Sequence, residues 1–350
     1  MLMRLSGSEH FILFSSATLI ALLLNPLFRK LALAKKILDT PNSERKIQRT
    51  AVPYLGGFSI IISVFVVVTV ALVTHSADSR LYVRAASLLI PALLLGLVGY
   101  IDDVKHLGAG SRFIAQFLAG IFTAVILIGN ETVGTSFNNK AVDAALTILW
   151  VVGIANAINF LDNMDGAAGG VAAISAFGFF LVAIQSGQFL VAALGLVLSG
   201  ACLGYLRLNW SPAKIYMGDS GALFIGVLLA ALAVRLDPKE VAQPISFFIP
   251  VLLLAIPILD TSLVVIDRLR RRANPFEGGL DHMAHRLRRH GLSTRQSVGI
   301  MYLLQAVCVF MALYISAPGS DLDVFLSLAS LVAAFGIFIF FIKTPAEGRF

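Results

Sequence analysis

Long apolar stretches separated by short polar ones follow one another along the whole chain. A helix that crosses a bilayer needs about 20 mostly apolar residues. The pattern predicts eleven such helices and therefore an all-α polytopic integral membrane protein. The expected spans are residues 11–33, 54–74, 84–101, 113–129, 141–158, 167–185, 189–206, 219–235, 245–266, 297–317 and 323–342.

Basic residues are divided unequally between the two faces that these spans define. An odd number of spans puts the termini on opposite sides, and 21 of the 27 Lys and Arg residues fall in the odd-numbered loops and the C-terminal tail. The richer face is cytoplasmic by the positive-inside rule, so we expect the N-terminus outside and the C-terminus in the cytoplasm. The six on the other face are Arg4, Arg80, Arg84, Lys140, Arg235 and Lys239.

Composition supports the membrane prediction. The chain has 350 residues, of which 58% are hydrophobic and 13% charged, and its mean hydropathy is +0.86. We expect one membrane domain over residues 1–350, since no low-complexity linker divides it, and no removable signal peptide. The net charge of +7 is explained by topology and does not require a nucleic-acid partner. Cys202 and Cys308 lie in apolar segments, as small core residues do.

Five polar loops fall on the expected cytoplasmic face, at about residues 34–53, 102–112, 159–166, 207–218 and 267–296. The first carries Arg45 and Lys46 ahead of a Pro and a Gly pair. One interpretation is a phosphate-binding loop, and the other is an ordinary positive-inside anchor. The coincidence of unusual polar sequence with one face is the main clue to function.

Two adjacent carboxylates, Asp102 and Asp103, end the third span. Neighbouring carboxylates repel one another unless a cation neutralises them or one is protonated. Mg²⁺ bound to phosphate oxygens would supply that neutralisation, because it prefers oxygen ligands and is often held by one or two carboxylates. The alternative is that both acids simply reach water at the end of a helix.

A cluster of amides and acids follows the fifth span. If the helix continues, Asn156, Asn159 and Asn163 share one stripe, and Asp162 and Asp165 lie a turn apart on an overlapping face. Side chains of this polarity between two spans are hard to explain by packing, because a charged residue at mid-bilayer costs about 3 kcal/mol. They suit Mg²⁺ or the edge of a nucleotide base.

Two further polar elements complete the set. Asp219 opens the eighth span, where it could cap the helix or belong to an anion site, and Tyr216 could stack on a base or anchor the interface. His282 and His285 lie a turn apart before Arg286. Two histidines make a weak zinc signal, so we favour phosphate contact or proton handling over a solvated surface pair.

Together these stretches resemble the polyprenyl-phosphate N-acetylhexosamine-1-phosphate transferase superfamily, glycosyltransferase family 4, over about residues 39–290. The most specific signal is Asn-Ala-Ile-Asn-Phe-Leu-Asp-Asn-Met-Asp-Gly at 156–166, followed by Pro-Ala-Lys-Ile-Tyr-Met-Gly-Asp-Ser-Gly at 212–221. The resemblance implies a bundle of ten or eleven helices in the bacterial cytoplasmic membrane, with a cytoplasmic cleft, in a family whose members can dimerise. Family members transfer a sugar 1-phosphate from a UDP-sugar to a polyprenyl phosphate and use Mg²⁺, for which Mn²⁺ is an alternative.

The resemblance also implies residue roles. Asp219 and Asn159 correspond to metal-site positions, and Asp102 and Asp103 to an essential pair assigned either to metal binding or to deprotonation of the lipid phosphate. The catalytic residues expected are Asp102, Asp103, Asp162 and His285. The substrate-binding residues expected are Arg45, Lys46, Asn156, Asn163, Asp165 (uracil partner), Tyr216 (uracil stacking), His282 and Arg286.

One departure from the family pattern bears on the donor. Many members have His-X-His-His where this chain has His282-Met283-Ala284-His285, and the phospho-MurNAc-pentapeptide branch has three consecutive histidines. We therefore expect a UDP-N-acetylhexosamine donor, GlcNAc first, over UDP-MurNAc-pentapeptide. A membrane transporter is an alternative of another class, and a catalytically altered family member is a third.

Overall fold

The computed structural model describes residues 5–40, 51–75, 77–238, 243–275, 278–317 and 323–344. These residues form fourteen helices and one two-stranded antiparallel ribbon. The elements are α1 (Gly7–Lys35), β1 (Leu38–Asp39), β2 (Val52–Pro53), α2 (Gly56–Thr74), α3 (Ser79–Lys105), α4 (Ala109–Gly129), α5 (Lys140–Leu161), α6 (Ala167–Gln185), α7 (Phe189–Asn209), α8 (Gly218–Arg235), α9 (Gln243–Ser246), α10 (Phe248–Leu253), α11 (Ala255–Arg270), α12 (Met283–Arg289), α13 (Thr294–Ile315) and α14 (Asp323–Lys343).

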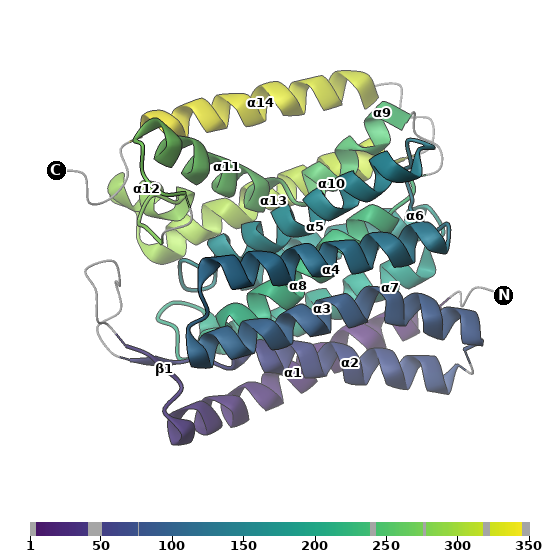
Figure 1. Ribbon diagram of the computed structural model, residues 1–350, viewed down its shortest axis with the longest axis horizontal. Helices are drawn as coiled ribbons and strands as arrows, with labels where there is room; N and C mark the ends of the chain where they lie inside the picture. Colours follow the sequence, from purple (N-terminus) through teal and green to yellow (C-terminus); the bar gives the residue numbers. More distant parts are fainter. Residues whose placement is uncertain are drawn as a thin grey trace.

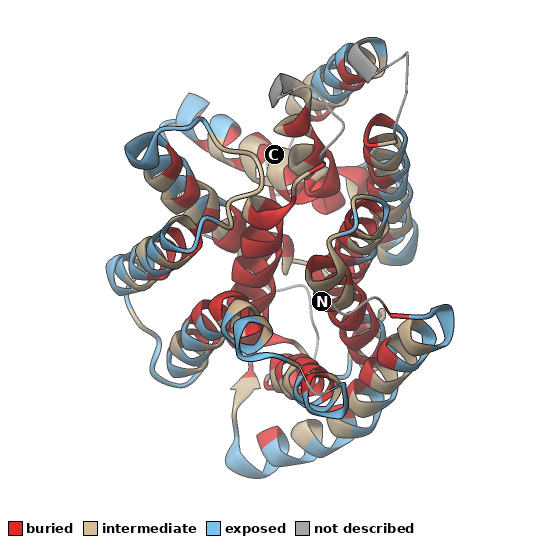
Figure 2. Cartoon of the chain, turned by 90° about the vertical axis from the view of Figure 1, so that its right-hand side faces the viewer, coloured by how far each residue is buried: buried red, intermediate tan, exposed pale blue. Residues whose placement is uncertain are grey.

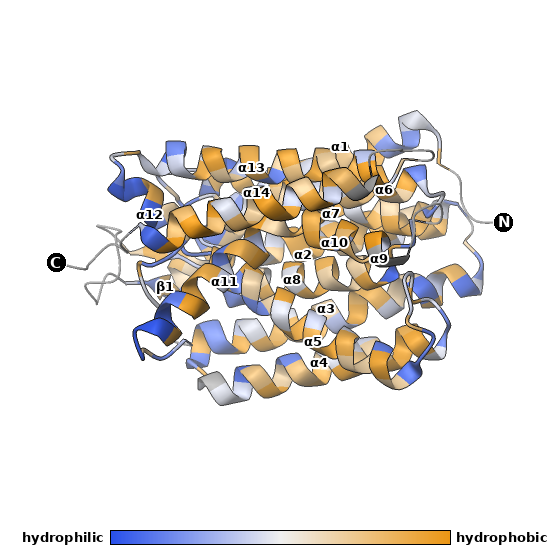
Figure 3. Cartoon of the chain, turned by 90° about the horizontal axis from the view of Figure 1, so that it is seen from above, coloured by the Kyte–Doolittle hydropathy of each residue, from blue (hydrophilic) through white to orange (hydrophobic). Residues whose placement is uncertain are grey.

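The long helices run side by side along one axis (Figure 1). Within the described residues, ten of them, α1 to α8, α13 and α14, are long and apolar enough to cross a bilayer. Large apolar side chains such as Phe11 and Val332, 71% and 72% exposed, lie on the outside, and hydrophilic residues gather at the two ends (Figure 3). The chain is therefore an all-α, multi-pass membrane protein, as the apolar pattern predicts.

The ninth expected span, 245–266, is not one continuous helix. It is divided into α9, α10 and α11, with a break at Leu254. Pro257 has no N–H to donate to the Leu253 carbonyl, which instead accepts a hydrogen bond from the buried side chain of Gln305 at 2.9 Å. The side-chain oxygen of Gln305, Oε1, accepts a hydrogen bond from the Ile256 N–H at 3.0 Å. One side-chain amide thus satisfies the backbone at the break, and the expected count of eleven continuous spans becomes ten plus an interrupted path.

The interrupted path crosses the bundle in the same way as its neighbours (Figure 1). As a result α1 begins at one end of the bundle and α14 ends at the other, which is the arrangement expected for an odd number of crossings (Figure 3). Which end faces the cytoplasm stays a prediction. The end at which α3 ends and α8 begins is called the site end below.

Helix α8 forms the centre of the bundle, where buried residues concentrate (Figure 2). It packs against α2, α3 and α5. The approach of α3 is especially close, because a Cβ atom added at Gly99 would lie 2.4 Å from the Asp219 carbonyl oxygen. The small residue at this position lets the last turns of α3 lie directly against the first turn of α8. The carboxylates of both helices therefore meet at the site end.

Candidate active site

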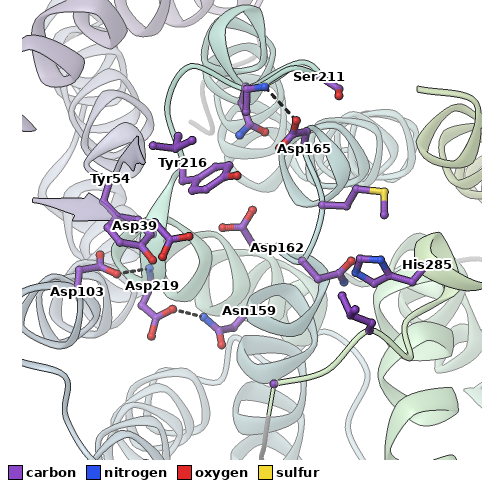
Figure 4. Close-up of a pocket in the computed structure, with 18 of the residues that line it drawn as sticks. Asp39, Tyr54, Asp103, Asn159, Asp162, Asp165, Ser211, Tyr216, Asp219 and His285 are labelled. Atoms are coloured by element: carbon purple, nitrogen blue, oxygen red, sulfur yellow. Dashed lines mark hydrogen bonds between the residues drawn. The ribbon is translucent and has the colours of Figure 1, made fainter. Parts of the chain in front are cut away.

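A cavity of about 1080 Å³ opens at the site end of the bundle. The end of α3, the start of α4, the α5–α6 turn, the segment before α8 and the segment around α12 all contribute to its wall. Nine of the residues expected from the sequence line it: Asp102, Asp103, Asn159, Asp162, Asn163, Asp165, Tyr216, Asp219 and His285. The β1–β2 ribbon adds Asp39 and Val52, so all five polar loops converge on one site, several of whose side chains point inward (Figure 4).

The other expected residues lie elsewhere. Asn156 and His282 line an adjoining cavity of about 530 Å³, which shares part of its wall with the first. Arg286 lines neither cavity, because its guanidinium is buried among Asp267 and backbone carbonyls near the end of α14. Arg45 and Lys46 lie outside the described residues.

Asp103 caps the start of α8 from the neighbouring helix. Its two carboxylate oxygens accept hydrogen bonds from the backbone N–H groups of Asp219 (2.9 Å) and Ser220 (3.2 Å). The first N–H groups of a helix have no partner within the helix and favour a negative charge. Gly218 makes room for this contact: its φ is +72°, and a Cβ there would lie 2.5 Å from an Asp103 oxygen. Asp103 therefore fixes the geometry between α3 and α8.

Asp102 faces a different partner. One guanidinium nitrogen of Arg112, Nη1, lies 3.1 Å from Asp102 Oδ2 and 3.2 Å from Asp219 Oδ2. Asp102 is almost fully buried, whereas Arg112 and Asp219 are partly open to the cavity. The adjacent acids of α3 are thus distinguished by their surroundings: one is bound by helix N–H groups and the other faces a cation.

Asp219 is also held by Asn159, whose Nδ2 donates to Asp219 Oδ1 at 2.8 Å (Figure 4). Among the described residues, no group of three or more His, Cys, Asp or Glu side chains is assembled as a metal site. The donors nevertheless fit Mg²⁺, because oxygens of Asp102 and Asp219 converge on one cationic atom and both are hard ligands. These two carboxylates would hold the ion, with Asn159 orienting Asp219.

Asp162 follows α5 directly and points into the cavity (Figure 4). Burial raises its pKa well above the usual range, and the nearby charges of Asp219, Asp103 and Asp165 add to this. A carboxyl group in such surroundings takes up a proton readily or attracts a cation. The stretch of acids at 162–165 therefore contributes electrostatics as well as hydrogen bonding to the site.

Two tyrosines form another part of the cavity wall, and Tyr54 lies beside Asp103 and Asp219 (Figure 4). Tyr54, just after β2, and Tyr216 have ring centroids 6.3 Å apart. Asp165 accepts a hydrogen bond from the Ala213 N–H at 3.0 Å, which ties the α5–α6 turn to the segment before α8. The buried Asn209 reinforces the same link through Gly166 and Ile215, at 3.0 Å each. These hydrogen bonds hold the α5–α6 turn and the segment before α8 together.

The segment around α12 is braced by buried ion pairs. Arg268 forms two hydrogen bonds to Asp281, at 2.6 and 2.7 Å, and although burial alone would raise the pKa of Asp281, this pairing lowers it to about 2. Asp260, in α11, lies 2.8 Å from His282 Nδ1. His285 reaches the cavity, and burial, followed by the neighbouring His282, lowers its pKa to about 4. The segment presents a neutral imidazole on a rigid support.

Comparison with known proteins supplies the family. A family model described as glycosyl transferase family 4 matches residues 85–237. The chain is 30% identical over 320 residues to a probable undecaprenyl-phosphate N-acetylglucosaminyl 1-phosphate transferase of Bacillus subtilis (strain 168), covering 89% of this chain and 87% of that relative. The chain belongs to glycosyl transferase family 4. The resemblance inferred from the motifs is thereby confirmed.

Two further family 4 relatives differ in their names. A decaprenyl-phosphate N-acetylglucosaminephosphotransferase of Mycobacterium tuberculosis (strain ATCC 25618 / H37Rv) is 32% identical over 303 residues, 77% of this chain and 73% of the relative. A phospho-N-acetylmuramoyl-pentapeptide-transferase of Bacillus cereus (strain AH187) is 32% identical over 246 residues, 64% of this chain and 74% of the relative. Family 4 membership makes the chain a transferase enzyme. The names of these two relatives differ in the group that is transferred.

Several residues in the cavity wall or in the contacts that brace the segment around α12 were not expected from the sequence. Arg112 enters the sequence analysis only through the count of basic residues, and Tyr54 only as the first residue of the expected span 54–74. The sequence does contain a signal for Asp260 and Asp267, because both acids lie at the end of an apolar stretch. Burying a charged side chain there costs free energy, so each acid is expected to have a partner. Their partners, His282 for one and Arg271 and Arg286 for the other, come from the next polar loop.

Proposed function

We propose that this enzyme transfers N-acetylhexosamine 1-phosphate from a UDP-sugar to a polyprenyl phosphate and releases UMP. The observation that carries the proposal is the convergence of Asp102, Asp219 and Arg112 in a cavity at one end of a membrane bundle. A water-soluble donor can enter such a cavity from one side while a lipid acceptor reaches it from the bilayer. A transporter would be expected to have its polar cluster nearer the middle of the bundle.

The reaction is a displacement at phosphorus. A phosphate oxygen of the lipid attacks the β-phosphorus of the donor, the bond from that phosphorus to the bridging oxygen breaks, and the bridging oxygen leaves with UMP. Mg²⁺ held by Asp102 and Asp219 would neutralise negative charge on the pyrophosphate. Arg112 adds positive charge beside it, so catalysis consists mainly of positioning and electrostatic stabilisation.

The nucleotide belongs on the aromatic wall. Tyr216 offers a face for stacking on uracil, with Tyr54 close beside it. Oδ2 of Asp165 accepts the hydrogen bond from Ala213. The other carboxylate oxygen, Oδ1, can accept a hydrogen bond from the base. His285 reaches the cavity from the other side, where the pyrophosphate would lie between the imidazole and the carboxylates.

The lipid belongs in the adjoining cavity of about 530 Å³. Phe113, Phe160 and Leu223 give it an apolar wall, and Arg112 and Asp219 stand where it meets the larger cavity. This arrangement lets a polyprenyl chain remain among apolar side chains while its phosphate reaches the acids. Asn156 and Gln116 exchange two hydrogen bonds, at 2.6 and 3.2 Å, in the same wall.

We infer UDP-GlcNAc as the donor, undecaprenyl phosphate as the acceptor and the cytoplasmic face of the bacterial inner membrane as the location, in the first membrane step of a cell-envelope glycan. The relatives named for GlcNAc-phosphate transfer match more of this chain than the muramoyl-pentapeptide relative does. Ala284 supports the same choice, because the consecutive histidines of the muramoyl branch are absent. The excess of basic residues in the loops at the site end supports the cytoplasmic location.

The test is a donor screen with purified, folded protein in detergent, Mg²⁺ and undecaprenyl phosphate. Radiolabelled UDP-GlcNAc should yield a labelled lipid and one UMP per lipid product, whereas UDP-MurNAc-pentapeptide should yield neither. Asp219→Ala should abolish both products and so exclude a contaminating activity. Release of UMP from no donor, with the protein folded, would reject the function and favour a catalytically altered family member.

A further inference from the structure

Arg112 occupies the position where a metal ion would be expected. Its Nη1 atom lies between Asp102 Oδ2 and Asp219 Oδ2, at 3.1 and 3.2 Å. Both acids belong to helices that other contacts hold in place, since Asp103 joins α3 to α8 and Asn159 fixes Asp219. The guanidinium, by contrast, is carried on a long side chain from the first turn of α4, and that side chain is 34% exposed. Of the three side chains, that of Arg112 is the longest and the most exposed.

The contact is also not the strongest one that arginine can make. Guanidinium groups bind carboxylates best through two parallel hydrogen bonds. Arg112 instead uses one nitrogen for both acids, and among the described residues its Nε and Nη2 donate to no protein acceptor. Arg268 provides the contrast, because it binds Asp281 through two nitrogens in a buried site. Arg112 thus neutralises negative charge on Asp102 and Asp219 through Nη1, and its Nε and Nη2 atoms can donate to another anion.

A divalent cation and this nitrogen cannot share the two carboxylates. Magnesium lies about 2.1 Å from its oxygen ligands, so it would sit within the space now taken by the guanidinium, and the two positive charges repel. Arg112 lines both cavities, and its side chain can turn away from the acids without leaving the site. A phosphate group at the junction of the cavities would then meet Nε and Nη2.

We propose that Arg112 is an exchangeable counter-ion: it neutralises Asp102 and Asp219 before metal binding, gives them up to the divalent cation, and then binds the phosphate of a substrate. This rests on the proposed function for the identity of the phosphate, although the exchange itself concerns only the chain and the metal. Arg112 lowers the affinity for metal in the absence of substrate, because its displacement must accompany metal binding. By linkage, an anion that binds Arg112 strengthens metal binding.

The experiment measures Mn²⁺ binding by electron paramagnetic resonance on the full chain in detergent, with no donor or acceptor present. Arg112→Gln should bind Mn²⁺ about tenfold more tightly than wild type, because the competing charge is removed. Arg112→Lys keeps a positive charge and should stay within about threefold of wild type. Lys105→Gln is the matched control: Lys105 is exposed, lies at the same end of the bundle and lines neither cavity, so its loss should leave Mn²⁺ affinity unchanged.

A second measurement covers folding. Without metal, Arg112→Gln leaves two carboxylates facing each other, so its Tm in EDTA should fall below that of wild type, and Mg²⁺ should raise it by more than it raises the wild-type Tm. If the glutamine variant does not fold in EDTA, it can be purified in Mg²⁺, and its Mn²⁺ affinity can be measured from the displacement of bound Mg²⁺ by Mn²⁺. Arg112→Met, which keeps the aliphatic length, repeats the test.

An unchanged or weaker Mn²⁺ affinity in Arg112→Gln overturns the exchange, as does an equal tightening in Lys105→Gln. The outcome is separable from the transferase assay. Tighter Mn²⁺ binding in a chain whose wild type transfers no sugar phosphate would keep the exchange and reject the function. Normal wild-type transfer with unchanged Mn²⁺ affinity in Arg112→Gln would reject the exchange alone.

Discussion

The carboxylate of Asp260 lies 2.8 Å from Nδ1 of His282, and it is completely buried. Its other oxygen accepts a hydrogen bond from the Met283 N–H at 2.6 Å. A carboxylate on Nδ1 favours the tautomer with the proton on that nitrogen and leaves Nε2 as the acceptor. Because His282 lines the smaller cavity, Asp260 orients an imidazole toward the proposed acceptor site.

Asp260→Asn should therefore lower kcat about tenfold or more, because an amide can present either a donor or an acceptor to Nδ1 and no longer fixes the ring. The KM for UDP-GlcNAc should change little, since Asp260 bonds His282 and Met283 and none of the residues proposed to bind the nucleotide. Release of UMP measures both constants, and the Tm monitors folding. Asp237→Asn is the control, because Asp237 follows the end of α8 that lies away from the site end. A wild-type kcat in Asp260→Asn would show that the orientation of His282 does not matter.

The two adjacent acids of α3 should respond differently to substitution. Asp103→Ala removes the partner of two helix N–H groups and should cost about 1–2 kcal/mol of unfolding free energy, as loss of a helix cap does. Asp102→Asn should leave the Tm closer to that of wild type but weaken Mn²⁺ binding, because Asp102 faces the cation position. Thermal unfolding and Mn²⁺ titration of both variants test the division. Equal effects on both readouts would contradict it.

The different roles of Asp102 and Asp103 could not be predicted from the sequence. The apolar pattern and the positions of Asp102, Asp103 and Asp219 are local features, and the sequence predicts them well. The contact of Asp103 with the start of α8 joins residues 116 positions apart, and nothing local distinguishes its carboxylate from that of its neighbour. Arg112 was missed for the same reason, because in the sequence it resembles any other basic loop residue.

The break in the ninth span is likewise a feature that the local sequence does not predict. Its hydropathy predicts a continuous helix, and Pro257 alone permits a kink as readily as a break. The break depends on Gln305, which reaches it from α13, 49 residues beyond Ile256. A buried amide in an apolar helix was the available signal, since such a group needs partners in a bilayer.

Gln305→Leu should destabilise the protein by about 1–3 kcal/mol, because the Ile256 N–H and the Leu253 carbonyl lose their partner in an apolar environment. Leu303→Ala, on an exposed part of the same helix, is the control and should have a much smaller effect. The Tm in detergent measures both. The proposed role of Gln305 is wrong if the leucine variant is as stable as wild type.

Gly218→Ala should be severely damaging. An alanine there needs a positive φ, and its Cβ would meet the Asp103 carboxylate at 2.5 Å, so the contact between α3 and α8 must open. We expect a lower Tm and a loss of UMP release of about a hundredfold or more, since displacement of catalytic groups by about 1 Å has such effects. Gly153→Ala, exposed in α5 with nothing within 4 Å of the added atom, should be neutral or slightly stabilising. Normal turnover in Gly218→Ala would refute the close contact of Gly218 with Asp103.

His285 gives the site a defined response to pH. Burial lowers its pKa to about 4 in the folded protein, below the ordinary value of about 6.5, so the unfolded chain binds a proton more readily than the folded one between these values. The folded protein therefore keeps its full stability above about pH 6.5 and loses stability as the pH falls toward 4, by an amount on the order of 3 kcal/mol for this group. His285→Gln should flatten the fall in Tm between pH 6.5 and 4 relative to wild type. The same pKa predicts that His285 stays neutral from pH 6.5 to 8, so an ionisation in the pH profile of kcat/KM within that range that disappears in His285→Gln would contradict the assignment.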